Sequence, residues 1–205
     1  MKRLLSAVAI ASATLVAALP ASAAVVVSFT PSSSHVAIGD TVDIQMVIAG
    51  LGDEILSAFD INLLFDGAIA SNTSVLFSGE AELGGAADTY FASTFGAGVT
   101  NVVGGSWLDD GDLLGQANSF ALVTFTMKGE ANGKTTLQLG ADPDYERNFV
   151  GLRFQSLAVQ AGTACLAVGT GSCDNGGTVP EPAGYGLAGL ALMAAGWAGR
   201  RRKSV

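Results

Sequence analysis

TVDIQMVI, at residues 41–48, carries the clearest structural signal in this chain of 205 residues. Apolar side chains alternate with mostly polar ones, with Val42, Ile44, Met46 and Ile48 set against Thr41, Asp43, Gln45 and Val47. A period of two places the two sets on opposite faces of a β-strand. The segment therefore predicts a strand with one face in a core and the other mostly in water, which is typical of antiparallel sheets.

Similar β-prone runs precede and follow this segment, separated by clusters of Gly, Asp, Asn and Ser. The predicted strands are residues 25–30, 41–48, 57–65, 75–78, 89–94, 99–103, 119–128, 135–139 and 151–160. Residues 130–134 contain Asn132-Gly133 and predict a hairpin. About nine strands without intervening helices predict an all-β sandwich or jelly roll. A parallel α/β sheet would need crossover helices, which the sequence lacks.

The N-terminus has the features of a secretory signal peptide. Lys2 and Arg3 precede the uncharged residues 4–19, and Pro20 then breaks the apolar run. Small residues follow at Ala21 and Ala23, which predicts cleavage after Ala23. We therefore expect residues 1–23 to direct export through the Sec translocon and to be removed by signal peptidase. The alternative is a retained membrane anchor.

The C-terminus is a second apolar segment. Residues 183–199 carry no charge, and as a helix they would extend about 25 Å, just enough to cross a bilayer core. Because the segment is mostly Ala and Gly, we expect a weak transmembrane helix. A basic cluster follows directly, formed by Arg200, Arg201, Arg202 and Lys203. Basic flanks stay in the cytoplasm, so the preceding domain faces outward.

Removing these two segments changes the charge of the remaining chain. The whole sequence has a formal net charge of -8, but residues 24–179 contain four basic and 17 acidic residues, a balance of -13. Nucleic acid is therefore excluded as a partner, because its binding requires a basic surface. An acidic surface favours solubility, cation binding or repulsion from anionic surfaces.

Two cysteines, Cys165 and Cys173, lie in the exported part of the chain, where disulfides persist. We expect them to pair, since the sequence supplies no partners for a cysteine-based metal or catalytic site. They fall in residues 161–179, which are rich in Gly, Ser and Thr and predict a linker. The predicted sandwich therefore occupies residues 24–160, and residues 180–205 follow the linker.

Residues for catalysis are scarce, so we expect no enzymatic activity. His35 is the only histidine, in a Ser-rich turn, which leaves histidine-dependent catalysis or metal binding almost nothing to use. Paired carboxylates are plentiful, but they fall mainly in predicted loops, whereas glycosidases hold theirs across a cleft.

Two acidic loops could bind calcium through carboxylate and carbonyl oxygens. The denser one contains Asp109, Asp110 and Asp112, and the other spans residues 142–146. Neither fits the twelve-residue EF-hand pattern, so a solvated turn is the alternative in each case. No other cofactor is expected.

Two aromatic residues near Gly-rich loops have two possible roles. Trp107 and Tyr90 could pack in the core or at a strand edge, or they could form a platform on which sugar rings stack.

Val179-Pro180-Glu181-Pro182, the apolar segment and the basic end together resemble the PEP-CTERM sorting signal of Gram-negative bacteria. The two prolines keep Glu181 in an extended segment, which a membrane-embedded protease could read. The resemblance implies cleavage by an exosortase at an inner-membrane stage. It also implies delivery to the cell surface or to an extracellular polysaccharide matrix. A plain membrane anchor that stays uncleaved is the alternative.

The exported domain resembles a cohesin. The similarity lies in residues 36–42, with a Gly-Asp turn into a strand, in residues 59–66, which end on Asp66, and in residues 120–139. The resemblance implies a nine-stranded jelly roll that binds dockerin modules. Gly67 replaces the family's usual Pro, and residues 79–88 form an atypical insertion, so the dockerin partner is less well supported than the fold.

Three functions are compatible with these features. The first is a non-enzymatic surface or matrix protein whose β-sandwich is an interaction or adhesion module associated with exopolysaccharide or biofilm. The second is a carbohydrate-binding module, and the third is an extracellular hydrolase.

Overall fold

The computed structural model describes residues 25–141 and 148–173. β-Strands dominate this part of the chain, with only short helical turns between them. The strands are β1 (Val25–Pro31), β2 (His35–Val36), β3 (Thr41–Ala49), β4 (Ala58–Leu64), β5 (Ala70–Leu76), β6 (Thr89–Gly96), β7 (Val99–Ser106), β8 (Ser119–Gly129), β9 (Gly133–Ala141), β10 (Phe149–Val150), β11 (Val159–Ala161) and β12 (Ala164–Val168). The helical turns are η1 (Glu80–Leu83), α2 (Asp110–Leu113) and η2 (Leu152–Phe154).

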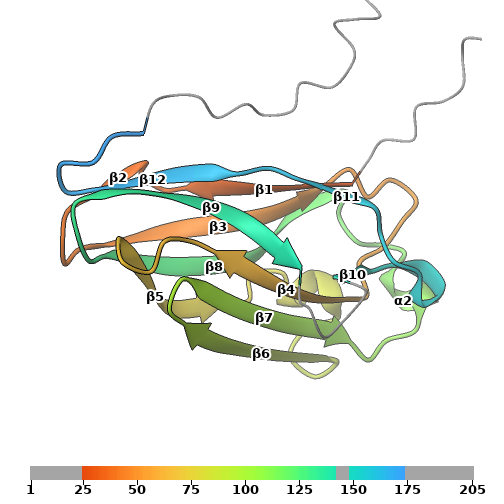
Figure 1. The fold of residues 1–205 in the computed structure, drawn as a ribbon. Coiled ribbons are helices and arrows are strands. Elements are labelled where there is room, and N and C mark those ends of the chain that lie inside the picture. Colours follow the sequence, from red (N-terminus) through yellow and green to blue (C-terminus); the bar gives the residue numbers. More distant parts are fainter. Residues whose placement is uncertain (1–24, 142–147, 174–205) are drawn as a thin grey trace, which may run out of the picture.

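The strands form two sheets that pack face to face (Figure 1). One sheet has the order β11-β1-β3-β8-β5, and the other has the order β2-β12-β9-β4-β7-β6, with β10 paired to β4. Most neighbouring strands are antiparallel, whereas β1 with β11 and β12 with β2 are parallel. The predicted all-β sandwich is confirmed for the described residues.

The core lies between the two sheets. In β3 the apolar set predicted from the sequence is buried, and its polar alternates face outward. β4 contributes Phe59, Ile61 and Leu63 from the opposite sheet, and these side chains are also buried. Burying apolar area contributes about 25 cal/mol per Å². The alternation in these two strands therefore determines which face of each sheet packs into the core.

A β-bulge in β8 explains its unusual pattern. The pairing with β3 passes from Met46 opposite Val123 to Val47 opposite Ala121, so Leu122 is an extra residue. An extra residue in one strand reverses which alternate side chains face inward. Leu122 and Val123 are consequently both buried. In the sequence, the apolar residues of this strand change parity between Leu122 and Val123, and the bulge is the reason.

Several predicted elements differ from the structure. β5 lies earlier than the predicted strand at residues 75–78, and residues 151–160 form a turn, η2 and the start of β11 instead of one strand. The predicted hairpin at residues 130–134 is also wrong, because β8 and β9 belong to different sheets. Asn132 uses its side-chain oxygen to accept a hydrogen bond from the backbone N–H of Thr170 at 2.9 Å.

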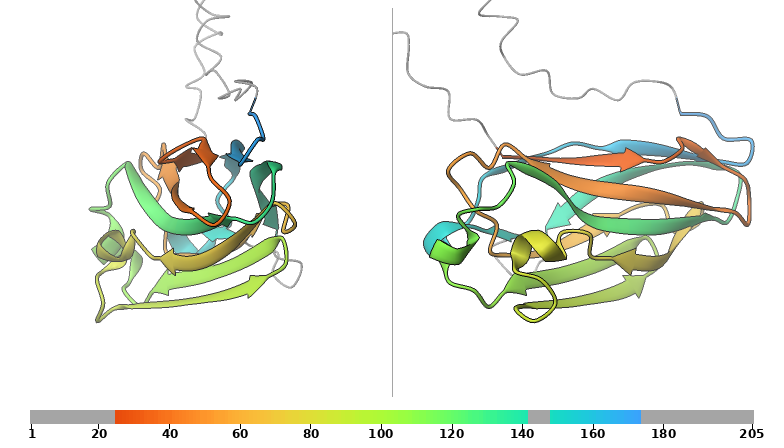
Figure 2. Two further views of the ribbon diagram at one scale, coloured as in Figure 1. Left: turned by 90° about the vertical axis from the view of Figure 1, so that its left-hand side faces the viewer. Right: turned by 180° about the vertical axis from the view of Figure 1, so that it is seen from behind.

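The sandwich extends beyond the predicted boundary at residue 160. β12 lies within the expected linker of residues 161–179 and pairs with β9, and its Leu166 is fully buried. Cys165 and Cys173 form a disulfide with a Cα–Cα distance of 5.8 Å. This bond ties the last described residues to β12. Those residues lie at the opposite end of the sandwich from α2 (Figures 1 and 2).

Three predicted segments lie outside the described residues: the signal peptide at residues 1–23, the transmembrane helix at residues 183–199 and the acidic loop at residues 142–146. Within the part that the structure describes, no helix is long and apolar enough to cross a membrane.

Candidate functional site

A cleft of about 750 Å³ opens at the end of the sandwich that carries α2. Its lining comes from four regions: β4, the β6–β7 pair with the loop after it, α2, and the β10–η2 segment. The lining residues are Ser57, Ala58, Tyr90, Ser106, Trp107, Leu108, Asp109, Asp110, Gly111, Val150 and Phe154. Three aromatic side chains and two carboxylates therefore share one concave surface.

Tyr90 and Trp107 form an aromatic pair on one side of the cleft. Their ring centroids are 4.8 Å apart with an interplanar angle of 39°. Tyr90 pairs with Gly105 on β7, and a Cβ atom at Gly105 would stand only 2.8 Å from the Tyr90 hydroxyl oxygen. The Tyr90 ring can lie against the neighbouring strand only because that residue is glycine.

Trp107 projects into solvent although its backbone is fixed. The backbone N–H of Trp107 donates to the backbone carbonyl of Asp88 at 2.7 Å, which continues the β6–β7 strand pairing by one more bond. The side chain remains 71% exposed, whereas Tyr90 is 37% exposed. Neither ring lies in the core, so packing there is excluded; Tyr90 lies on the edge strand β6, and strand-edge packing and an exposed aromatic platform both fit this arrangement.

Phe154 is the third aromatic residue of the cleft and is 73% exposed. Arg153 and Phe154 have φ angles of 55° and 59°, in the left-handed region that residues with a Cβ rarely occupy. The carboxylate of Asp110 accepts a hydrogen bond from the backbone N–H of Arg153 at 2.7 Å. Residues held in such conformations cost about 1–3 kcal/mol and cluster at functional sites.

Side-chain hydrogen bonds connect the chain segments at and beside the cleft. Ser57 is buried, and its hydroxyl donates to the carbonyls of Val150 at 3.0 Å and Gly151 at 3.3 Å. Beside the cleft, the Gln116 side-chain amide accepts a hydrogen bond from the Leu56 N–H at 2.8 Å and donates one to the Leu56 carbonyl at 2.7 Å. These contacts hold the chain segments around the aromatic residues in place.

The acidic residues predicted as a calcium site lie on α2. Asp109 is its N-cap residue, and Asp110 and Asp112 are in its first turn. Across residues 25–141 and 148–173, no group of three or more His, Cys, Asp or Glu side chains is placed to hold a metal ion. Asp110 instead bonds the backbone of η2. The calcium hypothesis therefore rests on the sequence alone.

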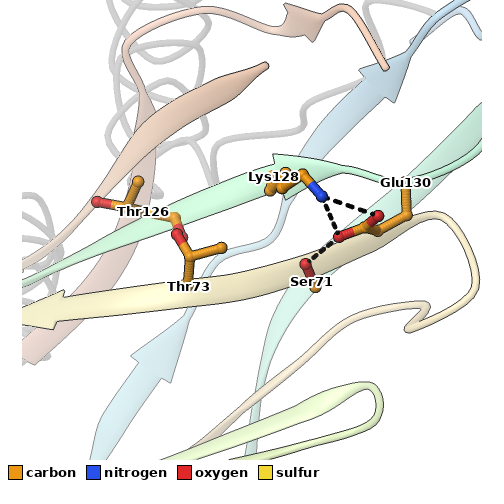
Figure 3. A network of polar contacts seen from close by, with 5 residues as sticks. All are labelled: Ser71, Thr73, Thr126, Lys128 and Glu130. Atoms are coloured by element: carbon orange, nitrogen blue, oxygen red, sulfur yellow. Dashed lines mark hydrogen bonds and ion pairs between the residues drawn. The ribbon is translucent and has the colours of Figure 1, made fainter. Parts of the chain in front are cut away.

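A polar cluster lies along β5 and β8 (Figure 3), and none of its residues lines the cleft. Glu130 accepts hydrogen bonds from Ser71 Oγ at 2.6 Å and from Lys128 Nζ at 3.2 Å. These bonds, that from Ser71 first, lower the pKa of Glu130 from its usual 4.5. Thr73, beside them, donates to the carbonyl of Thr126 at 3.0 Å. This cluster connects two strands of one sheet.

The remaining sequence candidates are separate from the cleft. His35 is exposed on β2, where Nε2 lies 2.7 Å from the carbonyl oxygen of Gly169. Three sets of predicted sorting residues lie outside the described residues: Ala21 with Ala23, Pro180 to Pro182, and Arg200 to Lys203.

Sequence reasoning missed two parts of this site. Phe154 fell inside a predicted strand. A left-handed backbone is usually signalled by glycine or asparagine, and neither stands at residues 153 and 154. The role of Asp110 depends on its contact with Arg153, which lies 43 residues further along the chain. Gly104-Gly105, directly after the predicted strand at residues 99–103, was the one signal that could have indicated a close approach of side chains.

Residues 178–203 match the family model of the PEP-CTERM protein-sorting motif. The chain carries a PEP-CTERM sorting signal. The predicted recognition is therefore confirmed, and the signal indicates export and membrane-associated sorting toward the cell surface. The match covers the C-terminal segment, after the sandwich and its disulfide.

The sandwich has a cohesin-like fold. A type II cohesin from the cellulosome of Acetivibrio cellulolyticus aligns with a TM-score of 0.55 and 10% identity, over 70% of this chain and 95% of the cohesin. A second cohesin from that organism, solved with a dockerin, aligns with a TM-score of 0.54 and 13% identity, over 71% of this chain and 99% of the cohesin. A non-cellulosomal cohesin from Archaeoglobus fulgidus aligns with a TM-score of 0.51 and 11% identity, over 71% of this chain and 91% of the cohesin. No curated protein matches the sequence.

Proposed function

We propose that this chain is exported, sorted by an exosortase and placed at the cell surface or in the extracellular matrix of a Gram-negative bacterium. There its sandwich acts as a non-enzymatic interaction module associated with exopolysaccharide or biofilm. The observation that carries this proposal is a PEP-CTERM signal directly following a cohesin-like domain. The acidic balance of residues 24–179 fits a soluble domain, because a high net charge favours solubility.

The proposed route has two membrane stages. Signal peptidase cleaves after Ala23 during Sec export, and residues 183–199 then hold the protein in the inner membrane. The basic residues from Arg200 to Lys203 keep the C-terminus cytoplasmic. Exosortase cleaves near Pro180-Glu181-Pro182 and releases the domain outward. A helix of mostly Ala and Gly suits a temporary anchor, because it contributes little insertion energy.

Substitution of Pro180→Ala together with Glu181→Ala tests this route. We expect the unprocessed chain to accumulate in the membrane fraction, since the protease would lose the extended segment and the carboxylate that it reads. Immunoblots of membrane, surface and medium fractions measure processing, and Asn175→Ala, upstream of the motif, is the matched control. Unchanged processing in the double variant would show a retained anchor instead.

A carbohydrate-binding module is the second candidate function. The exposed Tyr90–Trp107 pair favours it, because aromatic rings at a wet surface stack on sugar faces. Glycan-array binding that Trp107→Ala abolishes would support this function. A dockerin-type protein is the alternative partner, since one similar cohesin was solved with a dockerin. Capture of a dockerin that is insensitive to Trp107→Ala would favour that partner.

A further inference from the structure

We propose that the cleft binds a polysaccharide that carries free, positively charged amino groups, such as a polymer of glucosamine. This inference rests on the proposed extracellular interaction function and deepens it, because it names the ligand class of the same module. Three features carry it: exposed aromatic rings in a concave site, carboxylates beside them, and a backbone held in place before any ligand arrives.

The aromatic rings provide the contact surface. Trp107 and Phe154 are both more than two-thirds exposed and line the same cleft as Tyr90. Sugar rings present C–H faces that stack on aromatic side chains. An ammonium group above such a ring is attracted by the negative face of the ring, most strongly above Trp. A ligand with both sugar rings and ammonium groups uses this surface fully.

Charge selects among polysaccharides. Asp109 and Asp110 line the cleft, and among the described residues its lining contains no Lys or Arg. The surrounding domain is strongly acidic, at -13 over residues 24–179. Complementary charge raises the association rate and suppresses wrong partners, so the site disfavours uronic-acid or sulfated polymers. A cationic polymer gains attraction both at the cleft and from the whole domain.

The Phe154 side of the cleft is preorganised. The left-handed backbone at Arg153 and Phe154 is held by the Asp110 carboxylate on α2. A ring that is already in place loses less conformational freedom on binding, which improves affinity without adding contacts. Asp110 is therefore a positioning residue for Phe154. Asp109 is exposed in the lining and makes no side-chain cap hydrogen bond to α2, so its carboxylate supplies charge to the ligand.

The experiment compares three hexasaccharides by titration calorimetry against the full-length chain in detergent. They are a glucosamine hexamer, its N-acetylated counterpart and a galacturonic acid hexamer. At about pH 6 the amines are largely protonated, since a comparable α-amino group has a pKa of about 7.7. We expect the glucosamine hexamer to bind about tenfold more tightly than the N-acetylated one, and the galacturonate not to bind.

Matched variants place the binding in the cleft. Trp107→Ala should weaken glucosamine binding by about tenfold or more, because it removes the most exposed ring of the pair. Asp109→Asn should reduce the preference for the charged hexamer without affecting the N-acetylated one. Phe95→Ala removes another exposed aromatic ring, 52% exposed on β6 but outside the cleft, and should change nothing. Thermal melting verifies that each variant is folded.

The outcomes separate this inference from the proposed function. Equal binding of the glucosamine and N-acetylated hexamers, lost in Trp107→Ala, would overturn the charge selection and leave a neutral-sugar module. Binding of the glucosamine hexamer that survives both Trp107→Ala and Asp109→Asn would overturn the cleft as its site. Absence of sugar binding in a chain that is still sorted to the surface would overturn the inference alone.

Discussion

Asn72 places a polar group in the space between β5 and β7. Its Nδ2 donates to Thr100 Oγ1 at 3.1 Å, and Thr100 is fully buried. The Asn72 Oδ1 atom is also buried, and within residues 25–141 and 148–173 it has no hydrogen-bond partner. Buried polar atoms without partners cost free energy, so the Asn72 Oδ1 atom lowers the stability of the fold.

Thr100→Val should lower the free energy of unfolding by about 1–3 kcal/mol, because it removes the acceptor and leaves the Asn72 amide N–H unpaired. Asn72→Leu added to Thr100→Val should recover much of this loss, since both polar groups are then gone. Urea unfolding measures both effects. Thr94→Val, at an exposed position on β6, is the control and should stay within about 0.5 kcal/mol of wild type. Equal stability of Thr100→Val and wild type would contradict this account.

The pKa of Glu130 predicts a pH dependence of stability. Its hydrogen bonds from Ser71 and then from Lys128 favour the carboxylate, so the folded-state pKa lies below the usual 4.5. A lowered pKa means that this stabilisation is complete above the unfolded-state pKa and is lost as the pH falls through the folded-state pKa. The Tm difference between wild type and Glu130→Gln should therefore be largest near neutral pH and shrink below about pH 4.5.

Glu54→Gln is the matched control for this measurement, because Glu54 is exposed in the connection between β3 and β4, outside the β5–β8 cluster. A Tm difference for Glu130→Gln that is constant from neutral to acidic pH would show that the bonds to Ser71 and Lys128 do not favour the carboxylate.

At the scale of elements, β12 changes the domain boundary. It joins β9 and β2 in one sheet, and Leu166 lies in the core cluster. A linker would tolerate truncation of this side chain, whereas a core strand does not. We expect Leu166→Ala to lower the free energy of unfolding by about 2–5 kcal/mol. Exposed Thr170→Ala should have little effect, and equal stability of the two variants would restore the linker interpretation.

The elements that sequence patterns predicted well are those with clean alternation. β3 and β4 bury every second residue over their length, so their faces and bounds were close to the prediction. β12 is a short run of small and apolar residues without alternation, and its burial pattern follows from pairing with two distant strands. Local periodicity could not supply that information. The same limit applies to β8 and β9, whose connection looks like a hairpin but changes sheets.

At the scale of the whole molecule, the fold was predictable and the cleft only in part. Tyr90 and Trp107 were candidates from their residue type and Gly-rich surroundings, and strand pairing across β6 and β7 brings them together. Phe154 depends on a left-handed turn and a long-range contact to α2. Sites assembled from chain segments more than 40 residues apart are determined by tertiary packing, which no local pattern encodes.

The positions of the two ends of the sandwich determine how the protein meets its surroundings. The described chain ends at Cys173, at the end of the sandwich opposite α2 and the cleft (Figures 1 and 2). Strands such as β3, with nine residues rising about 3.3 Å each, make this long axis about 30 Å. A molecule held from its C-terminal side therefore points the aromatic cleft away from its attachment plane. Such an orientation favours capture of polymer arriving from outside over contact with neighbours on the same surface.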